Sequence, residues 1–426
     1  MSRSPAPPAP PTDHFFAVCP RGVEALLARE LLGLAAVDVV AEAGGVRFSG
    51  SLATAYAANL HSRIASRVLW RAASGHYRSE DDLYELARGV PWEREFSPEQ
   101  RLRVDVTAHR SPLHSLQFAT LRVKDAICDR AREVSGTRPS IDRARPDVQV
   151  LAHLDEQVAQ LYVDLSGESL FKRGWRADKG EAPIKENLAA ALLMLSGWTP
   201  EQPLLDPFCG SGTLVIEAAC MASGRPPGLG RRFGFEQLKG FDRAAWQGLK
   251  DAARAGVRDT LPAPLVGRDI SSQVVTLAQA NAVRAGLGAL LQSGAVQFAA
   301  GDARTGEPSA ERGWVVTNPP YGEQSNPRSA SVPAMMGDVA GQFKRRFAGW
   351  QVWMLSSDRK LPQQMRLKES GKTVLFNGAL ECRLFRFDMV EGSLRRTAAA
   401  RPAPLSDPPS APLPAASSGA GDPPVA

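Results

Sequence analysis

The chain has 426 residues, of which 43% are hydrophobic and 23% are charged, a composition typical of soluble globular proteins with two to three domains. Its net charge of +6 permits a polyanionic partner but does not require one. The longest apolar runs fall short of the roughly 18 residues that a membrane span needs, and the first residues lack a signal-peptide core. We therefore expect a cytoplasmic protein without membrane contact.

The cysteines do not form a pattern that holds a disulfide framework or a metal. They are odd in number, lack a Cys-x-x-Cys pair and have no companion histidine; they are Cys19, Cys128, Cys209, Cys220 and Cys382. We expect buried thiols and no metal site. Residues 1–13 and 393–426 are rich in Pro, Ala and Ser with almost no large apolar side chains, so we expect disordered tails.

Between the tails, residues 14–165 alternate short strands with amphipathic helices, such as the helix expected over 115–133, which is typical of small α+β modules rather than one sheet. Within this region, residues 101–145 carry ten Lys or Arg against five Asp or Glu, a net charge of +5. Charge alone fits a solvated face as well as it fits RNA contact.

From about residue 184 the pattern changes to strict alternation of strands and helices, with an antiparallel hairpin expected near residues 372–389. Parallel strands joined by crossover helices indicate a doubly wound α/β domain. In such sheets ligands bind beyond the carboxyl ends of the strands.

The first of these ends carries "DPFCGSGT", with Asp206 at the strand tip and Gly210 and Gly212 in a tight turn before a helix. Neither a dinucleotide fingerprint nor a P-loop is present. A carboxylate beside such glycines suits a ligand with a positively charged amino-acid portion, as in S-adenosylmethionine. Asp269 and Asp302 end the next two strands, where they are placed for the ribose hydroxyls and the adenine edge. For Asp269 or Asp302 alone, a turn or helix cap is the better explanation, but three carboxylates at one edge favour a ligand site.

The fourth strand ends in Asn318, Pro319, Pro320 and Tyr321. The lone pair of an exocyclic amine on a nucleobase is delocalised, so the amine is a poor nucleophile. The Asn318 side-chain oxygen and the Pro319 carbonyl could accept its hydrogens, the prolines fix the corner, and Tyr321 could stack on an extruded base. A simple proline turn is the competing interpretation.

With these motifs and "RGWRADKGEAPIKENLAAALLMLSGW", the chain resembles the THUMP-containing, S-adenosylmethionine-dependent RNA methyltransferases. It is most similar to the N-terminal half of the bacterial 23S ribosomal RNA guanine-N2 methyltransferases, over roughly residues 14–392. Some relatives carry a second methyltransferase domain; only the tail follows here, so we do not expect a bifunctional role.

The resemblance implies a ferredoxin-like segment at 14–54, a THUMP domain at 55–165 and a Rossmann-like class I methyltransferase domain at 166–392. It assigns the tetrapeptide at 318–321 to catalysis. It assigns further residues to the cofactor, which are Asp206, Cys209, Gly210, Gly212, Asp269, Asp302, Pro183, Lys185 and Glu186. It implies that the THUMP domain grips structured RNA, most simply 23S RNA or a large-subunit precursor, through basic side chains that include Arg122, Lys124, Arg138 and Arg143.

Three alternatives remain open at this point. A transfer-RNA guanine-N2 methyltransferase and a DNA adenine-N6 methyltransferase would share the local motifs, although a THUMP-like region counts against DNA. A non-catalytic RNA-binding ribosome-assembly factor would not require an intact cofactor site. The sequence does not give the modified nucleotide or the oligomeric state.

Overall fold

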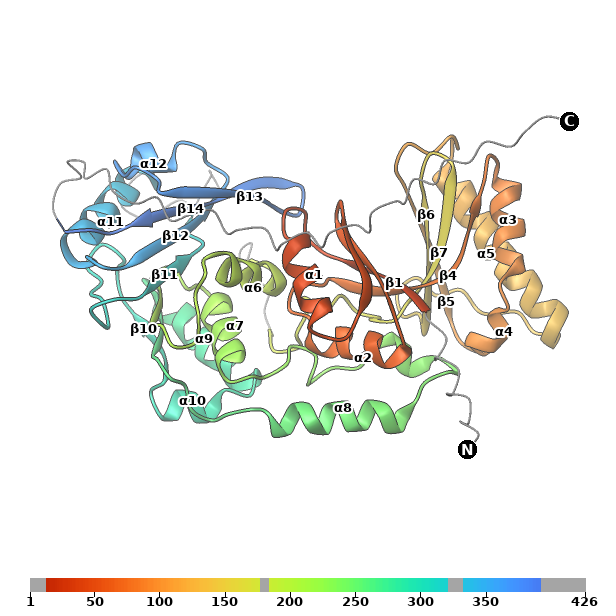
Figure 1. Ribbon diagram of the computed structural model, residues 1–426, viewed down its shortest axis with the longest axis horizontal. Helices are drawn as coiled ribbons and strands as arrows, with labels where there is room; N and C mark the ends of the chain where they lie inside the picture. The colour runs from red at the N-terminus through yellow and green to blue at the C-terminus, as the bar shows by residue number, and fades with distance from the viewer. Residues whose placement is uncertain (1–12, 177–183, 321–331, 392–426) are drawn as a thin grey trace, which may run out of the picture. The chain divides into compact units, whose positions relative to one another are not determined.

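The computed structural model describes residues 13–176, 184–320 and 332–391, and the strands in these ranges form two seven-stranded sheets (Figure 1). The first sheet is formed by residues between 13 and 164, and the second by residues between 204 and 388. One helix, α6 (Glu186–Leu195), lies between the two sheets in the sequence.

The first sheet has the strand order β2-β3-β1-β4-β7-β6-β5. Its strands are β1 (Asp13–Val18), β2 (Val37–Glu42), β3 (Gly45–Gly50), β4 (Arg67–His76), β5 (Leu102–Ala108), β6 (Val148–Leu154) and β7 (Val158–Asp164). Neighbours run antiparallel except β5 and β6, which are parallel. The ten residues of β4 pair with β1 at one end and with β7 along the strand. The sequence predicted separate modules, and this is wrong in one respect, because β4 joins them into one sheet.

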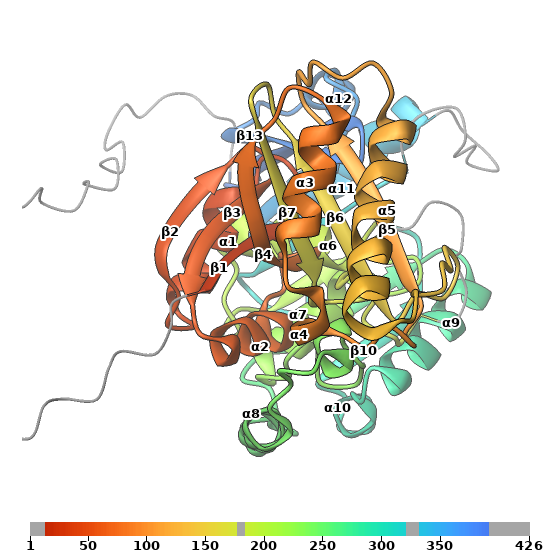
Figure 2. The same ribbon diagram turned by 90° about the vertical axis from the view of Figure 1, so that its right-hand side faces the viewer.

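The helices of this region are α1 (Glu24–Leu32), α2 (Leu52–His61), α3 (Glu80–Gly89), α4 (Trp92–Glu95) and α5 (Leu116–Ser135). They form two separate cores. Helices α1 and α2 pack around Phe15 and Phe48, whereas α3 and α5 lie side by side over the other end of the sheet and bury Val123 and Ile127 (Figure 2). Leu116, at the first position of α5, is 39% exposed.

The second sheet has the order β10-β9-β8-β11-β12-β14-β13 and confirms the doubly wound α/β prediction. Its strands are β8 (Leu204–Asp206), β9 (Leu265–Asp269), β10 (Val296–Ala300), β11 (Trp314–Thr317), β12 (Gln351–Ser356), β13 (Gly371–Asn377) and β14 (Leu380–Asp388). The strands from β10 to β12 are parallel, and β14 and β13 form the expected antiparallel hairpin at one end.

Both faces of the second sheet are covered. The remaining helices are α7 (Thr213–Ala222), α8 (Arg243–Ala255), α9 (Ser272–Arg284), α10 (Gly288–Gln292), α11 (Val332–Arg346), α12 (Leu361–Gln364) and the 3-10 turn η1 (Gly234–Gln237). Alternate strand residues enter two different cores: Val316 packs with α6, α7 and α9, whereas Val315 packs with α11. This period of two is why the parallel strands are apolar on both faces.

The long segment between β8 and β9 packs on the first sheet's α1–α2 core. Phe235 and Trp246 are buried in that core, and the Phe235 ring centroid lies 4.4 Å from that of Tyr56 on α2. Aromatic rings at such a distance contribute packing energy beyond their buried area. The segment between β8 and β9 therefore packs the region that carries the second sheet against the region that carries the first sheet.

A buried ion cluster makes a further connection between these regions. The Arg173 Nε lies 3.2 Å from Glu217 Oε1 on α7, with both side chains at most 3% exposed. Arg173 also donates a hydrogen bond to the carbonyl oxygen of Arg63 at 2.6 Å, and the Arg63 guanidinium approaches Glu217 at 3.8 Å. One carboxylate thus compensates two arginines that would otherwise be buried as unpaired charges.

We predict that Glu217→Ala lowers the free energy of unfolding by about 3–5 kcal/mol, because it leaves Arg173 as an uncompensated buried charge. The matched control is Glu168→Ala, which removes a carboxylate from an exposed pair with Lys172 and should cost about 1 kcal/mol or less. Thermal unfolding of both variants measures the difference. Equal midpoints for the two variants would show that the cluster does not stabilise the fold.

Candidate active site

The strand ends that carry the candidate residues lie side by side at one edge of the second sheet. Asp206 at the end of β8 pairs in register with Gly267 of β9, and Asp269 at the end of β9 pairs with Ala300 of β10. β11, which ends just before Asn318, lies on the other side of β8. The structure therefore gathers these residues at the carboxyl edge, where doubly wound sheets bind ligands.

The turn after β8 leaves its backbone open on one side. Gly210 and Gly212 have φ values of +51° and +87°, a region that glycine tolerates best. A Cβ at Gly212 would lie 3.0 Å from the Cβ of Ala278 and from the Phe298 ring, whereas a Cβ at Gly210 would meet no described residue within 4 Å. Gly210 therefore faces free space at the start of α7, where a ligand could lie against the backbone.

Cys209 in the same turn is a structural residue. It is 6% exposed, and its backbone N–H donates to the carbonyl oxygen of Arg268 at 2.8 Å. Burial raises the pKa of the thiol well above its usual value, so the side chain is neutral. Its contribution to a cofactor site would be shape rather than charge.

Asp269 holds the glycine turn against the end of β9. Its carboxylate accepts hydrogen bonds from the backbone N–H groups of Gly210, at 3.1 Å, and Ser271, at 3.0 Å. Each oxygen keeps a free lone pair, so the carboxylate can also accept the hydroxyls of a ribose. The next residue, Ile270, is 74% exposed, an apolar side chain at the ligand edge that the sequence interpretation did not single out.

Asp302 is less available than its position in the sequence indicated. Both of its oxygens accept hydrogen bonds from the Arg304 guanidinium at 2.5–3.0 Å, and the side chain is 27% exposed. This bidentate pair lowers the pKa of Asp302. A ligand amine at this carboxylate would share it with Arg304.

Asp206 lies inside the protein rather than on the ligand surface. It is 1% exposed and accepts hydrogen bonds from the Thr317 hydroxyl at 2.6 Å and the Phe208 N–H at 3.1 Å. Burial raises the pKa of Asp206 to about 7, with a further contribution from the nearby Asp269 charge. The Thr317 hydrogen bond ties the glycine turn to the residue that precedes Asn318, a connection that no short motif reveals.

The Asn318 side chain has an acceptor that no described residue satisfies. Its Oδ1 is buried and has no hydrogen-bond partner among the described residues, and Pro319 after it is also buried. A buried acceptor without a donor costs about 1–3 kcal/mol, so such groups mark places where a ligand supplies the donor. Pro320 is half-buried at the same corner, and Tyr321 lies outside the described residues.

The segment before α6 reaches the glycine turn through Arg176. The Arg176 guanidinium donates to Glu186 at 3.0 Å, to Thr213 at 2.9 Å and to Ser211 at 3.3 Å. Glu186 is therefore a buried support for the turn, and burial raises its pKa. Lys185 is exposed with its Nζ 5.0 Å from the Phe171 ring centroid, and Pro183 lies outside the described residues.

The basic candidates for RNA contact differ in how they are paired. On α5, Arg122 lies 2.5 Å from Asp81 and over the Tyr84 ring, and Lys124 lies 2.8 Å from Asp125. Arg138 approaches Asp125 at 3.8 Å. Arg143 is exposed and has no carboxylate within 4 Å in the described part of the chain, so it is the most available of the four.

Two expectations about composition can be compared with the structure. All five cysteines are buried, as predicted. Within residues 13–176, 184–320 and 332–391, no cluster of His, Cys, Asp and Glu has the size to hold a metal ion. Over the same ranges, no helix is both long and apolar enough to cross a bilayer.

Comparison with known families agrees with the two-sheet architecture. Residues 173–386 match the RMKL-like methyltransferase domain, residues 77–164 the THUMP domain and residues 14–69 the RlmL ferredoxin-like domain. This chain belongs to the RMKL-like methyltransferase family. The resemblance inferred from the sequence motifs is therefore confirmed, as is the expected combination of ferredoxin-like, THUMP and class I methyltransferase modules.

Curated relatives include the ribosomal RNA large subunit methyltransferases K/L of Shewanella baltica (strain OS185) and Shewanella oneidensis. They are 40% identical over 389 residues and 39% identical over 392 residues, covering 90% of this chain and 54% of each relative. The chain thus spans about half the length of these relatives.

Solved structures match over the whole described fold. SMU.472, crystallised with S-adenosylhomocysteine (SAH), is 28% identical with a TM-score of 0.80, covering 90% of this chain and 99% of that one. A Listeria monocytogenes protein, described as a predicted N6-adenine-specific DNA methylase, is 29% identical with a TM-score of 0.80 over 89% and 97%. TrmN from Thermus thermophilus, at 21% identity and a TM-score of 0.63, shares the fold over 89% of this chain and 100% of its own.

The raised pKa of Asp206 predicts a pH dependence of stability. Because the folded-state value of about 7 exceeds the ordinary 3.8, the folded chain keeps the proton longer, and the free energy of unfolding should fall as pH rises from about 4 to about 7. Asp206→Asn cannot ionise and should escape this loss. We expect its melting temperature relative to the native chain to be higher at pH 8 than at pH 5.

The control for this measurement is Asp251→Asn, which changes an exposed carboxylate on α8. Its melting temperature relative to the native chain should not follow the same trend. If Asp206→Asn shifts the melting temperature equally at both pH values, the carboxyl is not the protonated group that its burial implies.

Proposed function

We propose that this chain transfers a methyl group from S-adenosylmethionine to the exocyclic N2 amine of a guanine in 23S ribosomal RNA. The observation that carries the proposal is the buried Asn318 Oδ1 at the end of β11, which has no partner among the described residues and lies beside the glycine turn. The name of the Shewanella relatives supports the ribosomal substrate, and the SAH bound to SMU.472 supports the cofactor.

The residues present fit this cofactor. Gly210 offers an uncovered backbone, Asp269 has acceptor capacity for ribose hydroxyls, and Ile270 offers an exposed apolar surface for an adenine ring. Cys209 and Gly212 shape the turn, and Arg176 with Glu186 fixes it from behind. When bound, the cofactor supplies a methyl group activated by an adjacent sulfonium.

The contribution of the protein is to orient the amine. Asn318 Oδ1 would accept one N2–H and the Pro319 carbonyl oxygen the other, which turns the nitrogen lone pair away from these acceptors and toward the methyl carbon. Pro319 and Pro320 hold these acceptors in place. The methylated nitrogen carries a positive charge and loses its proton readily, so no general base is required. Proximity and alignment then account for most of the rate.

RNA would be held by the THUMP region at residues 55–165, with Arg143, Arg138, Arg122 and Lys124 as phosphate contacts. Such contacts provide affinity and register rather than base readout. A transfer-RNA guanine-N2 methyltransferase and a non-catalytic assembly factor are the alternatives. The description of the Listeria neighbour supports testing DNA adenine as a substrate as well.

The primary experiment measures tritiated methyl transfer from S-adenosylmethionine to unmodified 23S RNA, transfer RNA and duplex DNA, followed by nucleoside analysis. We expect N2-methylguanosine in 23S RNA only. Label in transfer RNA, or N6-methyladenine in DNA, would keep the mechanism but replace the substrate. Absence of label together with undetectable cofactor binding would contradict the enzymatic proposal.

Two substitutions separate chemistry from cofactor binding. Asn318→Ala should lower kcat by about 100-fold or more, by analogy with the loss of one positioned hydrogen-bonding group, while cofactor affinity stays near that of the native chain. Asp269→Ala should instead weaken cofactor binding measured by calorimetry. If Asn318→Ala reduces cofactor affinity as much as turnover, the residue supports the cofactor and does not position the amine.

The pairing of the basic residues predicts an order of effects on RNA binding. Arg143→Ala should weaken binding more than Arg122→Ala, because the Arg122 guanidinium is already engaged by Asp81 and Tyr84. Arg143→Ala should also reduce, by roughly one, the slope of log binding constant against log salt concentration. Filter binding at two salt concentrations tests this, with Arg254→Ala on α8 as the control. The reverse order would place the RNA along α5.

A further inference from the structure

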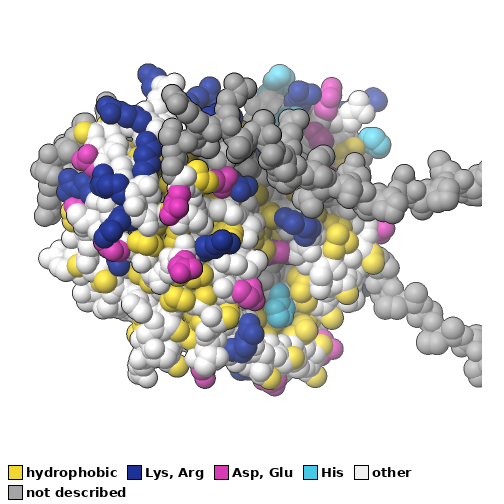
Figure 3. Space-filling view, turned by 60° about the vertical axis from the view of Figure 1, so that its left-hand side comes forward, with side chains coloured by type: hydrophobic (Ala, Val, Ile, Leu, Met, Phe, Trp, Pro, Cys, Tyr) yellow, Lys and Arg dark blue, Asp and Glu magenta, His cyan; other side chains and the backbone are white. Residues whose placement is uncertain are grey.

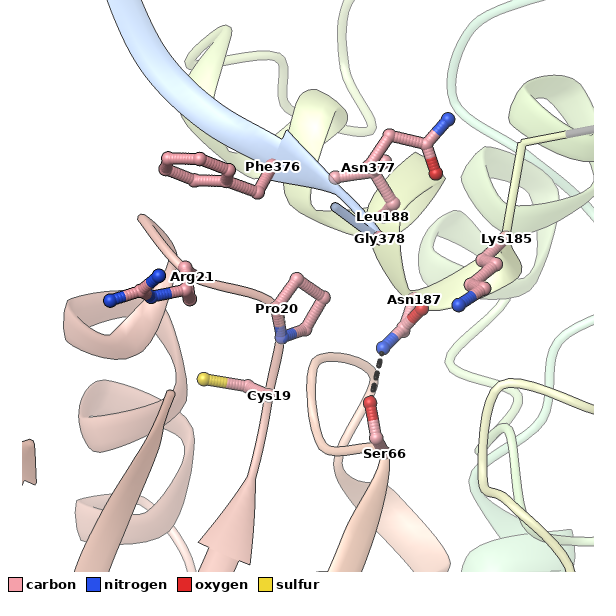
Figure 4. A pocket seen from close by; sticks show the side chains of 10 residues that line it. All are labelled: Cys19, Pro20, Arg21, Ser66, Lys185, Asn187, Leu188, Phe376, Asn377 and Gly378. Carbon is pink, nitrogen blue, oxygen red and sulfur yellow. Dashed lines mark hydrogen bonds between the residues drawn. The ribbon is translucent and has the colours of Figure 1, made fainter. Parts of the chain in front are cut away.

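A cavity of about 230 Å³ lies where four distant parts of the chain meet. The segment after β1 contributes Cys19 and Arg21, and the segment before β4 contributes Ser66 (Figure 4). The start of α6 contributes Lys185 and Asn187, and the end of β13 contributes Phe376 and Asn377. The volume is below the roughly 300–1,000 Å³ of sites for larger ligands, and it suits a single base or a phosphate.

The walls of this cavity are held by direct contacts. The backbone N–H of Phe376 donates to the carbonyl oxygen of Arg21 at 3.1 Å. Gly22, with φ of +92°, lies so close to β13 that a Cβ there would be 2.8 Å from the carbonyl oxygen of Val374. The cavity is therefore preformed, which lowers the entropic cost of binding a ligand.

Asn187 gives the cavity an unsatisfied acceptor. The residue is fully buried, and its Nδ2 donates to the Ile64 carbonyl oxygen at 3.2 Å and to Ser66 Oγ at 3.0 Å. These bonds define the orientation of the carboxamide. Figure 4 shows its nitrogen turned toward Ser66 and its oxygen turned away from Ser66. Asn187 Oδ1 has no partner among the described residues. It calls for a ligand with an N–H donor.

The cations at the cavity are not neutralised by the protein. Arg21 and Lys185 are exposed, and neither has a carboxylate within 4 Å in the described part of the chain. Both lie near aromatic rings instead: Arg21 Cζ is 5.7 Å from the Phe376 ring centroid, and Lys185 Nζ is 5.0 Å from that of Phe171. Among the described residues that line the cavity none is acidic, so their charge favours an anionic group such as phosphate.

Side-chain contacts and strand pairing link the residues around the cavity to the candidate active site. Glu186, between two lining residues, is held by Arg176, which also contacts Thr213 at the start of α7. β14 begins beside the end of β12, because Arg383 pairs with Ser356, so the β13–β14 turn lies at the same edge as Asn318. The strand order places it on the side of β11 away from Asp302.

The chain after residue 341 is also basic in composition. Residues 341–391 carry ten Lys or Arg against five Asp or Glu, including Lys344, Arg345 and Arg346 in the last turn of α11. Figure 3, which brings the left-hand side of Figure 1 forward, shows Lys and Arg side chains gathered in the upper left of that view. A second positive surface thus lies outside the THUMP region.

We propose that this cavity binds a second nucleotide of the RNA substrate, close to the target guanine. Asn187 Oδ1 accepts an N–H of its base, and Arg21 and Lys185 bind its phosphate. The assignment rests on the proposed function, because it takes RNA as the substrate. It makes the junction of the ferredoxin-like and methyltransferase modules, and not the THUMP domain alone, responsible for positioning the target.

The test measures RNA affinity at two salt concentrations and cofactor affinity separately, on the full chain. Arg21→Ala should weaken binding of a 23S RNA fragment several-fold and reduce the log-log salt slope by roughly one. Asn187→Ser should weaken it by up to about tenfold, the worth of one hydrogen bond to the base. Cofactor affinity should not change for Arg21→Ala. Arg254→Ala removes the same charge from α8 and should change neither affinity.

Cross-linking provides a readout that does not depend on a substituted chain. RNA containing 4-thiouridine should cross-link to peptides that include residues 19–21, 185–188 or 376–378. RNA affinity of Arg21→Ala equal to the native chain, or cross-links confined to residues 77–164, would overturn the proposal. If the native chain methylates 23S RNA in the same experiments, only the cavity assignment fails; if it methylates no RNA, the proposed function fails first.

Discussion

The packing of α6 on two sides is the constraint on which the rest of the structure depends. Its Leu188 and Leu192 enter the core of the second sheet, whereas Ala190 and Ala191 enter the core formed by α1 and α2. A helix that is apolar all round must be buried all round. The region that carries the first sheet therefore cannot move away from the second sheet without exposing this helix to water. The glycine turn, which Arg176 links to the start of α6, is held in position for the same reason.

The parts of the structure that could be predicted from the sequence are those set by local patterns. The strand and helix alternation after residue 184 and the carboxyl-edge positions of Asp269 and Asn318 follow from local periodicity, and the structure has them there. Local patterns cannot show which partners a side chain finds across the fold. The Asp206 bond to Thr317, the Asp302 pair with Arg304 and the Arg176 contacts to the glycine turn were therefore missed.

The joined first sheet was missed for a related reason. Each module shows its own alternation of strands and helices, and each has its own core, so the sequence has two separate signals. Continuity depends on β4, whose residues 67–70 pair with β1 while residues 69–76 pair with β7. Strand pairing between distant segments depends on register and burial rather than on local propensity. One long strand is enough to join the strands of two modules into a single sheet.

The buried side-chain oxygens of two asparagines, Asn187 and Asn318, have no hydrogen-bond partner among the described residues. Each costs stability, and each is fixed: Asn187 by its hydrogen bonds to Ile64 and Ser66, Asn318 by the prolines that follow it. A carboxamide oxygen accepts a hydrogen without taking the proton, so it suits an amine that must keep its lone pair for bond formation. A carboxylate at Asn318 would hold the methylated ammonium by charge and oppose its release. The same neutral acceptor at Asn187 can hold a base without repelling the adjacent phosphate, which is why an amide fits both positions.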